Sequence, residues 1–205
     1  MTRILRRTYY VGVDLAQAQD HSAIAVVERA EVDTGKMDMV HYQKIVVERC
    51  ALVRAERIRL GTPYAQVAAR VGQVVRGLRG LGGATVVADA TGVGAPVMEM
   101  LRKEKMGCQL VPVVITGGHE VTQSTRATNV PKKDLMMKLV AMIETRELVV
   151  AADMPGRAEW EEESRGMRLE SLSGRRDDVV LAVALACWRA KRGKIGESGE
   201  RLVLW

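Results

Sequence analysis

The stretch YYVGVD (residues 9–14) has the composition of a short, mostly buried β-strand and places Asp14 inside that strand. Tyr and Val favour strands, whereas burial of an unpaired carboxylate is costly, so this acid needs a partner. A second apolar run covers residues 23–27, and the polar residues between the two runs predict a hairpin. Residues 33–35 predict the next turn, and residues 39–47 predict a third strand. The chain is therefore expected to begin with a three-stranded antiparallel meander.

Beyond the meander, apolar strands alternate with amphipathic helices. Residues 84–88 and 110–115 are apolar, which is typical of strands buried on both faces, and a helix between them predicts parallel pairing. The predicted helices begin at the cap Thr62 with Pro63 in the first helical position, at Gly94, at Pro131, at Glu159 and at Asp177. The expected fold class is α/β: a central mixed sheet, with three antiparallel strands and then parallel βαβ units, flanked by helices on both faces.

Length and composition limit the possible classes of protein. The 205 residues suit one domain over residues 1–190, followed by a polar tail over residues 191–205. The apolar runs are too short to span a bilayer, and three widely spaced cysteines indicate a reducing compartment, so we expect a soluble, cytoplasmic protein with no membrane partner. The net charge of +6 and the isoelectric point of about 9.4 favour a polyanionic partner such as double-stranded DNA.

Four acids are the main candidates for catalysis. In the expected strand order, the strand of Asp14 is the neighbour of the strand that ends at Asp89, and Asp177 and Asp178 begin an apolar helix that packs on the same sheet. Clustered carboxylates repel one another, and a cation that prefers oxygen ligands, Mg²⁺ or Mn²⁺, relieves that repulsion. Two such ions can hydrolyse a phosphodiester bond, so the pattern predicts a two-metal nuclease site. Each acid also has a structural interpretation, as a strand-end or turn residue or as a partner of the helix N-terminus.

The two adjacent acids are expected to differ in role. Their side chains point about 100° apart on a helix, so both cannot face one ion equally well. Asp177 is the better candidate for the N-cap, because the apolar helical residues begin at Val179. We therefore predict that Asp178 matters more for metal binding.

Basic residues close to the acids are candidates for DNA binding. Lys132 and Lys133 start a predicted helix, and Arg126 lies in the long polar connection that precedes it. Arg175 and Arg176 come directly before the acidic pair. Side chains of this kind contact the phosphate backbone in DNA-binding proteins, although they also occur on ordinary solvated surfaces.

The remaining polar candidates are weaker. His21 and His119 lie in polar loops, where solvent exposure is the usual outcome, and Asp20 has the position of a turn residue. The segment TGVG (residues 91–94) resembles a phosphate-binding turn, but the sequence contains no GxxxxGK[ST] motif. A P-loop nucleotide hydrolase is therefore excluded.

Four motifs, in this order, resemble the nuclease domain of phage terminase large subunits. They are YYVGVDLAQAQDHSAIAVVE (9–28), VVADATGVGAPVMEML (86–101), VPKKDLMMKLVAMIETRELVV (130–150) and RRDDVVLAVALACW (175–188). The first motif is shared by many RNase H-like proteins, whereas DATGVG followed by DDVVLAVALA at this separation is specific. The resemblance covers most of residues 8–190.

The resemblance implies an RNase H-like fold and an endonuclease that cuts concatemeric viral DNA during genome packaging. It implies two divalent ions bound by acids that match Asp14, Asp89 and the Asp177–Asp178 pair. It also implies a packaging ATPase motor, a small terminase subunit and a portal as partners, in the cytoplasm of a host cell. Two features depart from the family. Relatives often carry His where this chain has Arg176, and the motor has no counterpart here, so it is a separate chain or part of a longer protein.

Other functions stay open on the sequence alone. A related nuclease of the Holliday-junction-resolvase kind would form a dimer that selects four-way junctions. A non-catalytic module that docks DNA or a motor protein would bind no metal. Half of an actin-like ATPase would use DATGVG for phosphate, but a domain of 205 residues lacks the second lobe that such a cleft needs.

Overall fold

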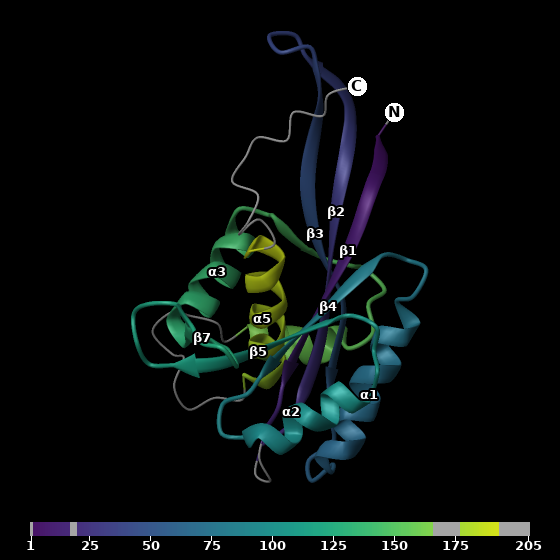
Figure 1. Ribbon diagram of the computed structural model, residues 1–205. Coiled ribbons are helices and arrows are strands. Elements are labelled where there is room, and N and C mark those ends of the chain that lie inside the picture. The colour runs from purple at the N-terminus through teal and green to yellow at the C-terminus, as the bar shows by residue number, and fades with distance from the viewer. Residues whose placement is uncertain (1, 17–19, 166–176, 193–205) are drawn as a thin grey trace.

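The computed structural model describes residues 2–16, 20–165 and 177–192. The strands are β1 (Arg3–Asp14), β2 (Ala23–Asp38), β3 (Gln43–Arg57), β4 (Gly83–Asp89), β5 (Gln109–Thr116), β6 (Thr122–Gln123), β7 (Thr128–Pro131) and β8 (Leu148–Val150). The helices are α1 (Tyr64–Gly77), α2 (Gly94–Lys103), α3 (Lys132–Glu144), α4 (Arg157–Ser164) and α5 (Asp178–Arg192). Within the described residues the strands form one mixed sheet, in the order β6-β7-β5-β4-β1-β2-β3-β8 (Figure 1).

The central position of β1 confirms the predicted fold class. β1 pairs with β2 in antiparallel orientation and with β4 in parallel orientation, as the sequence pattern predicted. Alternate residues of β1 point to opposite faces of the sheet, so Tyr9, Val11 and Val13 join the core beneath α1 and α2. Tyr10 joins a second core on the other face, where α3, α4 and α5 lie. The sheet is thus covered by helices on both faces.

Gly12 allows α5 to approach β1 closely. A Cβ atom at Gly12 would lie 1.9 Å from the backbone oxygen of Ala182, a distance that atoms do not tolerate. Gly12 belongs to the same face of β1 as Tyr10 and Asp14, because alternate strand residues share a face. The close approach therefore places the buried helix α5 directly over the half of β1 that ends in an acid.

We expect Gly12→Ala to destabilise the protein by about 3 kcal/mol, which lowers Tm by roughly 6–12 °C. The added methyl group forces α5 away from β1, and the buried contacts of both elements are lost. Gly83→Ala is the matched control, since its Cβ would have no heavy atom within 4 Å. Thermal melts of both variants test this expectation, and an unchanged Tm for Gly12→Ala would contradict the close approach.

The first three strands are longer than predicted, and they form a projecting arm (Figure 1). The arm consists of residues 3–7 of β1, 30–38 of β2 and 43–49 of β3. The chain reverses at residues 39–42, so the predicted turn at 33–35 is wrong, and that segment is a register irregularity inside the β2–β3 pair. The predicted third strand over 39–47 is correspondingly misplaced.

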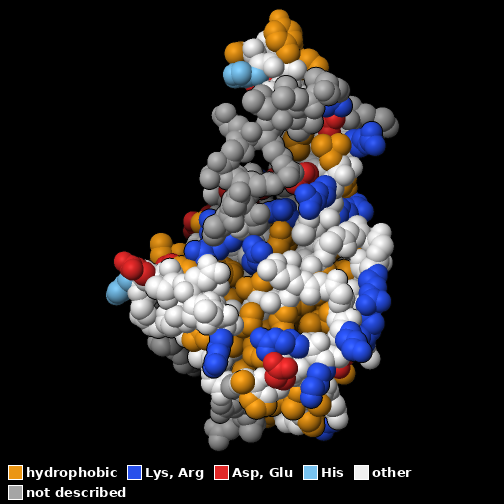
Figure 2. All heavy atoms as spheres, in the orientation of Figure 1, with side chains coloured by type: hydrophobic (Ala, Val, Ile, Leu, Met, Phe, Trp, Pro, Cys, Tyr) orange, Lys and Arg blue, Asp and Glu red, His pale blue; other side chains and the backbone are white. Residues whose placement is uncertain are grey.

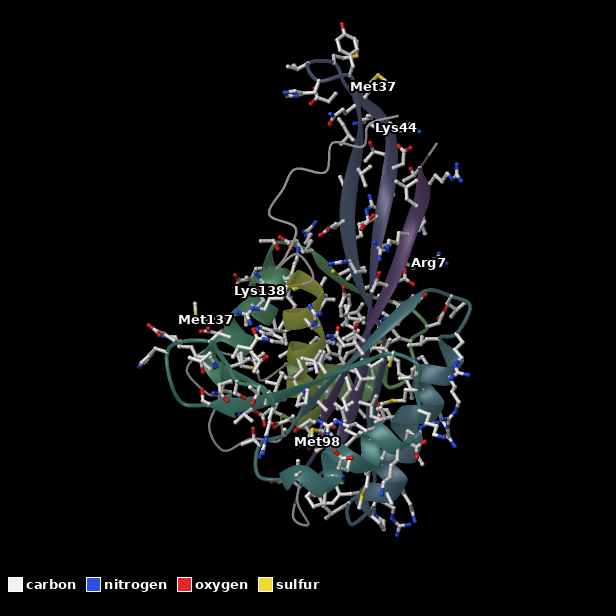
Figure 3. All side chains as sticks on the ribbon, in the orientation of Figure 1. Arg7, Met37, Lys44, Met98, Met137 and Lys138 are labelled. Atoms are coloured by element: carbon white, nitrogen blue, oxygen red, sulfur yellow. The ribbon has the colours of Figure 1, made fainter. Side chains whose placement is uncertain are left out.

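The charged residues of the arm explain why the sequence pattern missed it. Most side chains of the arm are exposed, although Ala30 and Val32 are buried, so its strands do not show the long apolar runs that mark a strand buried on both faces. Ion pairs across the strands join Arg7 to Glu28 at 3.6 Å and Lys44 to Asp33 at 3.1 Å. Figure 3 labels Arg7 and Lys44 along the arm, and Figure 2 shows hydrophobic side chains gathered at its tip. The exposed apolar residues of the tip are Met37, Met39, Val40 and Tyr42.

Two further local predictions are corrected by the structure. Thr62 does not cap α1, because its hydroxyl donates a hydrogen bond to the Arg59 carbonyl at 2.6 Å, and Pro63 takes the N-cap position. The polar connection over residues 116–130 contains the short strands β6 and β7, and β7 pairs with β5 in parallel orientation. β7 has only four residues and ends in proline, so its sequence pattern is too short to be identified as a strand without the neighbouring β5.

α5 continues to Arg192, two residues past the predicted domain boundary, and the rest of the predicted tail lies outside the described residues. Cys50 and Cys187 are buried, Cys108 is half-buried, and all three thiols are free. Across the described part of the chain, none of the helices has the length and apolar character needed to cross a bilayer.

Candidate metal centre

Asp14 and Asp89 lie side by side at the C-terminal ends of two neighbouring central strands, β1 and β4. Each is the last residue of its strand, and the preceding residues, Val13 and Ala88, are partners in the parallel pair β1–β4. Both acids share the sheet face that is covered by α5, by the alternation of strand side chains. Each is only 7% exposed. The sequence pattern had placed Asp14 inside the strand, whereas the structure makes it the last residue of β1. Its position beside Asp89 is as predicted.

The packing of α5 brings Asp178 to the same place. Ala182 lies over Gly12, and Asp178 precedes Ala182 by about one helical turn, or ~6 Å along the helix. Asp14 lies two residues beyond Gly12 on the strand, a similar distance of ~6.6 Å. Asp178 is 8% exposed. The Gly12–Ala182 contact thus aligns the first residue of α5 with the last residue of β1.

Burial raises the pKa values of Asp14, Asp89 and Asp178, and the proximity of other acids adds to the shift for Asp14 and Asp178. Burial raises the pKa of Asp14 well above its ordinary value, and the charges of Asp89, Asp178 and Asp177 raise it further. Burial also raises the pKa of Asp89, while hydrogen bonds from Thr91 oppose that shift. The pKa of Asp178 is raised to about 6, first by burial and then by neighbouring acids. Without a counter-ion, this arrangement disfavours the ionised carboxylates.

Lys132 is the cation of the cluster. It is the first residue of α3, and its Nζ atom lies 2.7 Å from Oδ2 of Asp177. Its charge also lowers the pKa values of Asp14 and Asp89, so the ammonium group is near all three acids. Lys132 was predicted to bind DNA, and the structure gives it an intramolecular partner at the centre of the candidate site.

Asp177 holds the N-cap position of α5, as predicted, since its carbonyl oxygen accepts a hydrogen bond from the Leu181 N–H, but the side chain that caps the helix is that of Glu163. The Glu163 carboxylate accepts hydrogen bonds from the backbone N–H groups of Val179 and Val180, at 2.8 and 3.1 Å. These are the N–H groups that a cap residue usually satisfies. Asp177 instead directs its carboxylate to Lys132. The predicted difference between Asp177 and Asp178 stays a prediction, but the reason offered for it is wrong.

Two residues that the sequence analysis ranked as weak lie close to Asp178. The charge of Asp20 raises the pKa of Asp178, and the charge of His21 lowers it. The imidazole Nδ1 of His21 lies 2.9 Å from the carbonyl oxygen of Ile58. A signal for both residues was present, because the loop that joins β1 to β2 must lie at the edge of the sheet where β1 ends. Glu163 carried no such signal, since it is one of three consecutive glutamates.

The other predicted DNA-binding residues are less tied to the acids. Lys133 is exposed on the first turn of α3, and Arg126 is exposed in the connection between β6 and β7. His119 is exposed in the connection between β5 and β6, as predicted. Arg175 and Arg176 lie outside the described residues.

The chemistry of the four acids suits a hard divalent cation. Asp14, Asp89, Asp177 and Asp178 offer only carboxylate oxygens, the donors that Mg²⁺ and Mn²⁺ prefer. Among residues 2–16, 20–165 and 177–192, however, no three His, Cys, Asp or Glu side chains are already arranged closely enough to hold an ion. The donor set therefore fits a metal, and the side chains would have to close in to bind it.

Comparison with solved structures identifies the fold as RNase H-like. The nuclease domain of human cytomegalovirus terminase superposes with a TM-score of 0.58 at 10% identity, over 88% of this chain and 82% of that one. The manganese-soaked form of that domain gives a TM-score of 0.57 at 9% identity, over 87% and 81%. RuvC of T. thermophilus, in complex with a Holliday-junction substrate, gives a TM-score of only 0.41 at 13% identity, over 92% of this chain and 96% of that one. By sequence, the chain matches no protein-family model and no curated protein.

Proposed function

We propose that this protein is a divalent-metal-dependent DNA endonuclease that hydrolyses phosphodiester bonds with two ions of Mg²⁺ or Mn²⁺. The observation that supports this most strongly is the convergence of Asp14, Asp89 and Asp178 from three separate elements at one buried edge of the sheet. Three acids that are each less than 10% exposed are costly in a structural role, since each disfavours the charge of the others. A cation turns this repulsion into binding energy. The fold shared with a terminase nuclease domain supports the same assignment.

Each residue of the site has a distinct role in this proposal. Asp14, whose pKa responds to the three other acids, would be a ligand at the centre of the site. Asp89 and Asp178 would hold the ions together with Asp14, and Asp177 would add a further carboxylate when it is not paired with Lys132. The ions would supply positive charge for the attacking and leaving oxygens of the phosphodiester. Lys132, freed from Asp177, is then placed to bind a phosphate of the DNA beside the site.

We further propose that this nuclease acts in viral genome packaging, in the cytoplasm of a host cell. Its partners would be double-stranded DNA, an ATPase motor, a small terminase subunit and a portal. The four sequence motifs and the fold of the cytomegalovirus terminase nuclease domain support this assignment. In this proposal residues 1–190 form the nuclease domain, and residues 191–205 form a tail.

The direct experiment is incubation of the protein with supercoiled plasmid in Mn²⁺, in Mg²⁺ and in excess chelator. We expect nicked and linear DNA with either metal and intact DNA with the chelator. Full cleavage in excess chelator would overturn the metal mechanism. Absence of both metal binding and DNA cleavage would overturn the enzymatic assignment and favour a non-catalytic docking module.

DNA binding is expected to be tolerant of sequence and to weaken steeply with salt, because contacts to phosphate release counterions. Lys133→Ala and Arg126→Ala should each flatten the slope of log K against log salt by about 1, and the Lys132–Lys133 double alanine variant by more. Lys36→Ala is the control, since Lys36 is exposed on the arm, away from the acids. Fluorescence anisotropy with a short duplex measures the slopes. An unchanged slope for the double variant would remove these lysines from the DNA interface.

A further inference from the structure

Glu163 is a buried acid on α4 whose two oxygens are both occupied. Its side chain is 2% exposed. Oε1 accepts a hydrogen bond from Nη2 of Arg57 at 2.6 Å, and Oε2 accepts the N–H groups of Val179 and Val180. A buried carboxylate is stable only when such partners replace its water. Glu163 therefore connects three elements: α4, which carries it, β3, which carries Arg57, and the N-terminus of α5.

This connection has a direct effect on the acidic pair. The N–H groups that Glu163 satisfies belong to the residues immediately after Asp178, so the helix start is held from outside rather than by its own cap residue. The carboxylate of Asp177 is thereby released from capping and faces Lys132. A neutral Ser or Asn at Asp177 would cap α5 without a further negative charge beside Asp178. Capping by the charged Glu163 places another negative charge near Asp178 and raises the pKa of Asp178, which is unfavourable for the ionised acids when no metal is bound.

We propose that Glu163 is a positioning residue: by capping α5 from α4, while tethered to Arg57, it holds Asp177 and Asp178 in the orientation in which they bind the metal ions with Asp14. This inference rests on the proposed nuclease function. Glu163 acts through hydrogen bonds at a fixed reach, and it is not itself a ligand. Its reach, rather than its charge, is the property that the site requires.

Three substitutions separate reach from charge. Glu163→Gln keeps the length and one carbonyl oxygen for the two N–H groups, whereas Glu163→Asp keeps the charge but is one methylene shorter. Glu163→Ala removes both. Glu162→Ala is the matched control, because Glu162 is the neighbouring acid, is 68% exposed and also contacts Arg57, at 3.3 Å, without touching α5.

The measurements are a Mn²⁺ titration of the DNA-free protein, amide hydrogen exchange at Val179 and Val180, and a thermal melt. For Glu163→Asp and Glu163→Ala we expect Mn²⁺ binding to weaken by about tenfold or more, as for other residues that orient metal ligands, with faster exchange at both amides. Glu163→Gln should stay within about threefold of the native affinity, and Glu162→Ala should be unchanged. If Glu163→Ala does not fold, the Asp and Gln variants decide the question.

The possible contradictory results point to different errors. Native Mn²⁺ affinity in Glu163→Asp and Glu163→Ala, together with a lowered Tm, would reduce Glu163 to a structural cap and overturn the inference alone. Weak binding in Glu163→Gln with native binding in Glu163→Asp would make the charge decisive and overturn it in favour of a direct ligand. Failure of the unmodified protein to bind Mn²⁺ would overturn the proposed metal mechanism itself, and this inference with it.

Discussion

Asp14→Asn and Asp89→Asn are each expected to reduce DNA cleavage by at least about 10³-fold while the protein stays folded. Asn has nearly the same shape as Asp but lacks the charge that a divalent cation requires. Both side chains are buried at the end of a strand, so the change removes a ligand without creating a cavity. Because the acids act as a unit, the double variant should be little worse than either single one.

The control for this pair is Asp153→Asn, which removes a charge from an exposed turn. Its cleavage rate should equal that of the unmodified protein. Plasmid cleavage at saturating Mn²⁺ measures the rates, and thermal melts verify folding. Native activity in either Asp14→Asn or Asp89→Asn would show that the acids are not the metal ligands. The same preparation also detects a contaminating nuclease, since such an activity would survive in both variants.

The second large effect concerns stability in the absence of metal. The metal-free protein should become less stable as the pH rises from about 4.5 to about 7, because Asp178 has a pKa of about 6 in the folded protein against an ordinary value of 3.8. A pKa that is raised by folding means that the fold favours the protonated form. The corresponding stability is fully present below pH 3.8 and is lost as the pH rises through about 6. A difference of 6 − 3.8 = 2.2 corresponds to about 3 kcal/mol.

Asp178→Asn should therefore stabilise the metal-free protein at pH 8 by a similar amount, up to about 3 kcal/mol, and should flatten the pH profile. The pKa values of Asp14 and Asp89 are raised in the same direction, so part of the slope should persist. The acids whose pKa values are lowered, such as Glu56, change the stability only below about pH 4.5, so they do not contribute to the slope above that pH. Mn²⁺ should restore stability at pH 8 to the unmodified protein more than to the variant.

Thermal melts with chelator at pH values from about 4.5 to about 8 test this expectation, and most of the loss should occur below about pH 7. Asp153→Asn is again the control, and its profile should follow that of the unmodified protein. A profile that is flat, or that rises with pH, would mean that the acids are not coupled in the metal-free state. An Asp178→Asn variant that is less stable than the unmodified protein at pH 8 would show that this carboxylate has a structural role.

The sequence was sufficient to locate the strands that carry the first two acids. An acid that directly follows an apolar run is conspicuous, because burial of a lone carboxylate is costly. Asp14 and Asp89 both have this position, and the order of strands and helices predicted that β1 and β4 are neighbours. The apolar helix that follows Asp178 predicted a buried element on the same sheet. Each of these signals is local in the chain, and local patterning reports which side of an element is buried.

The tertiary structure alone decided which side chains satisfy one another around those acids. The sequence pattern does not distinguish Glu163 from the two glutamates before it. Only the packing of α4 against α5 brings its carboxylate to the N–H groups at the start of α5. Lys132 pairs with Asp177, although 45 residues separate them along the chain. The arm escaped prediction for the same reason, since its strands are stabilised by their cross-strand partners rather than by an apolar face. Periodicity in a sequence records the burial of a face, whereas hydrogen bonds and ion pairs between distant residues depend on distances that exist only once the chain has folded.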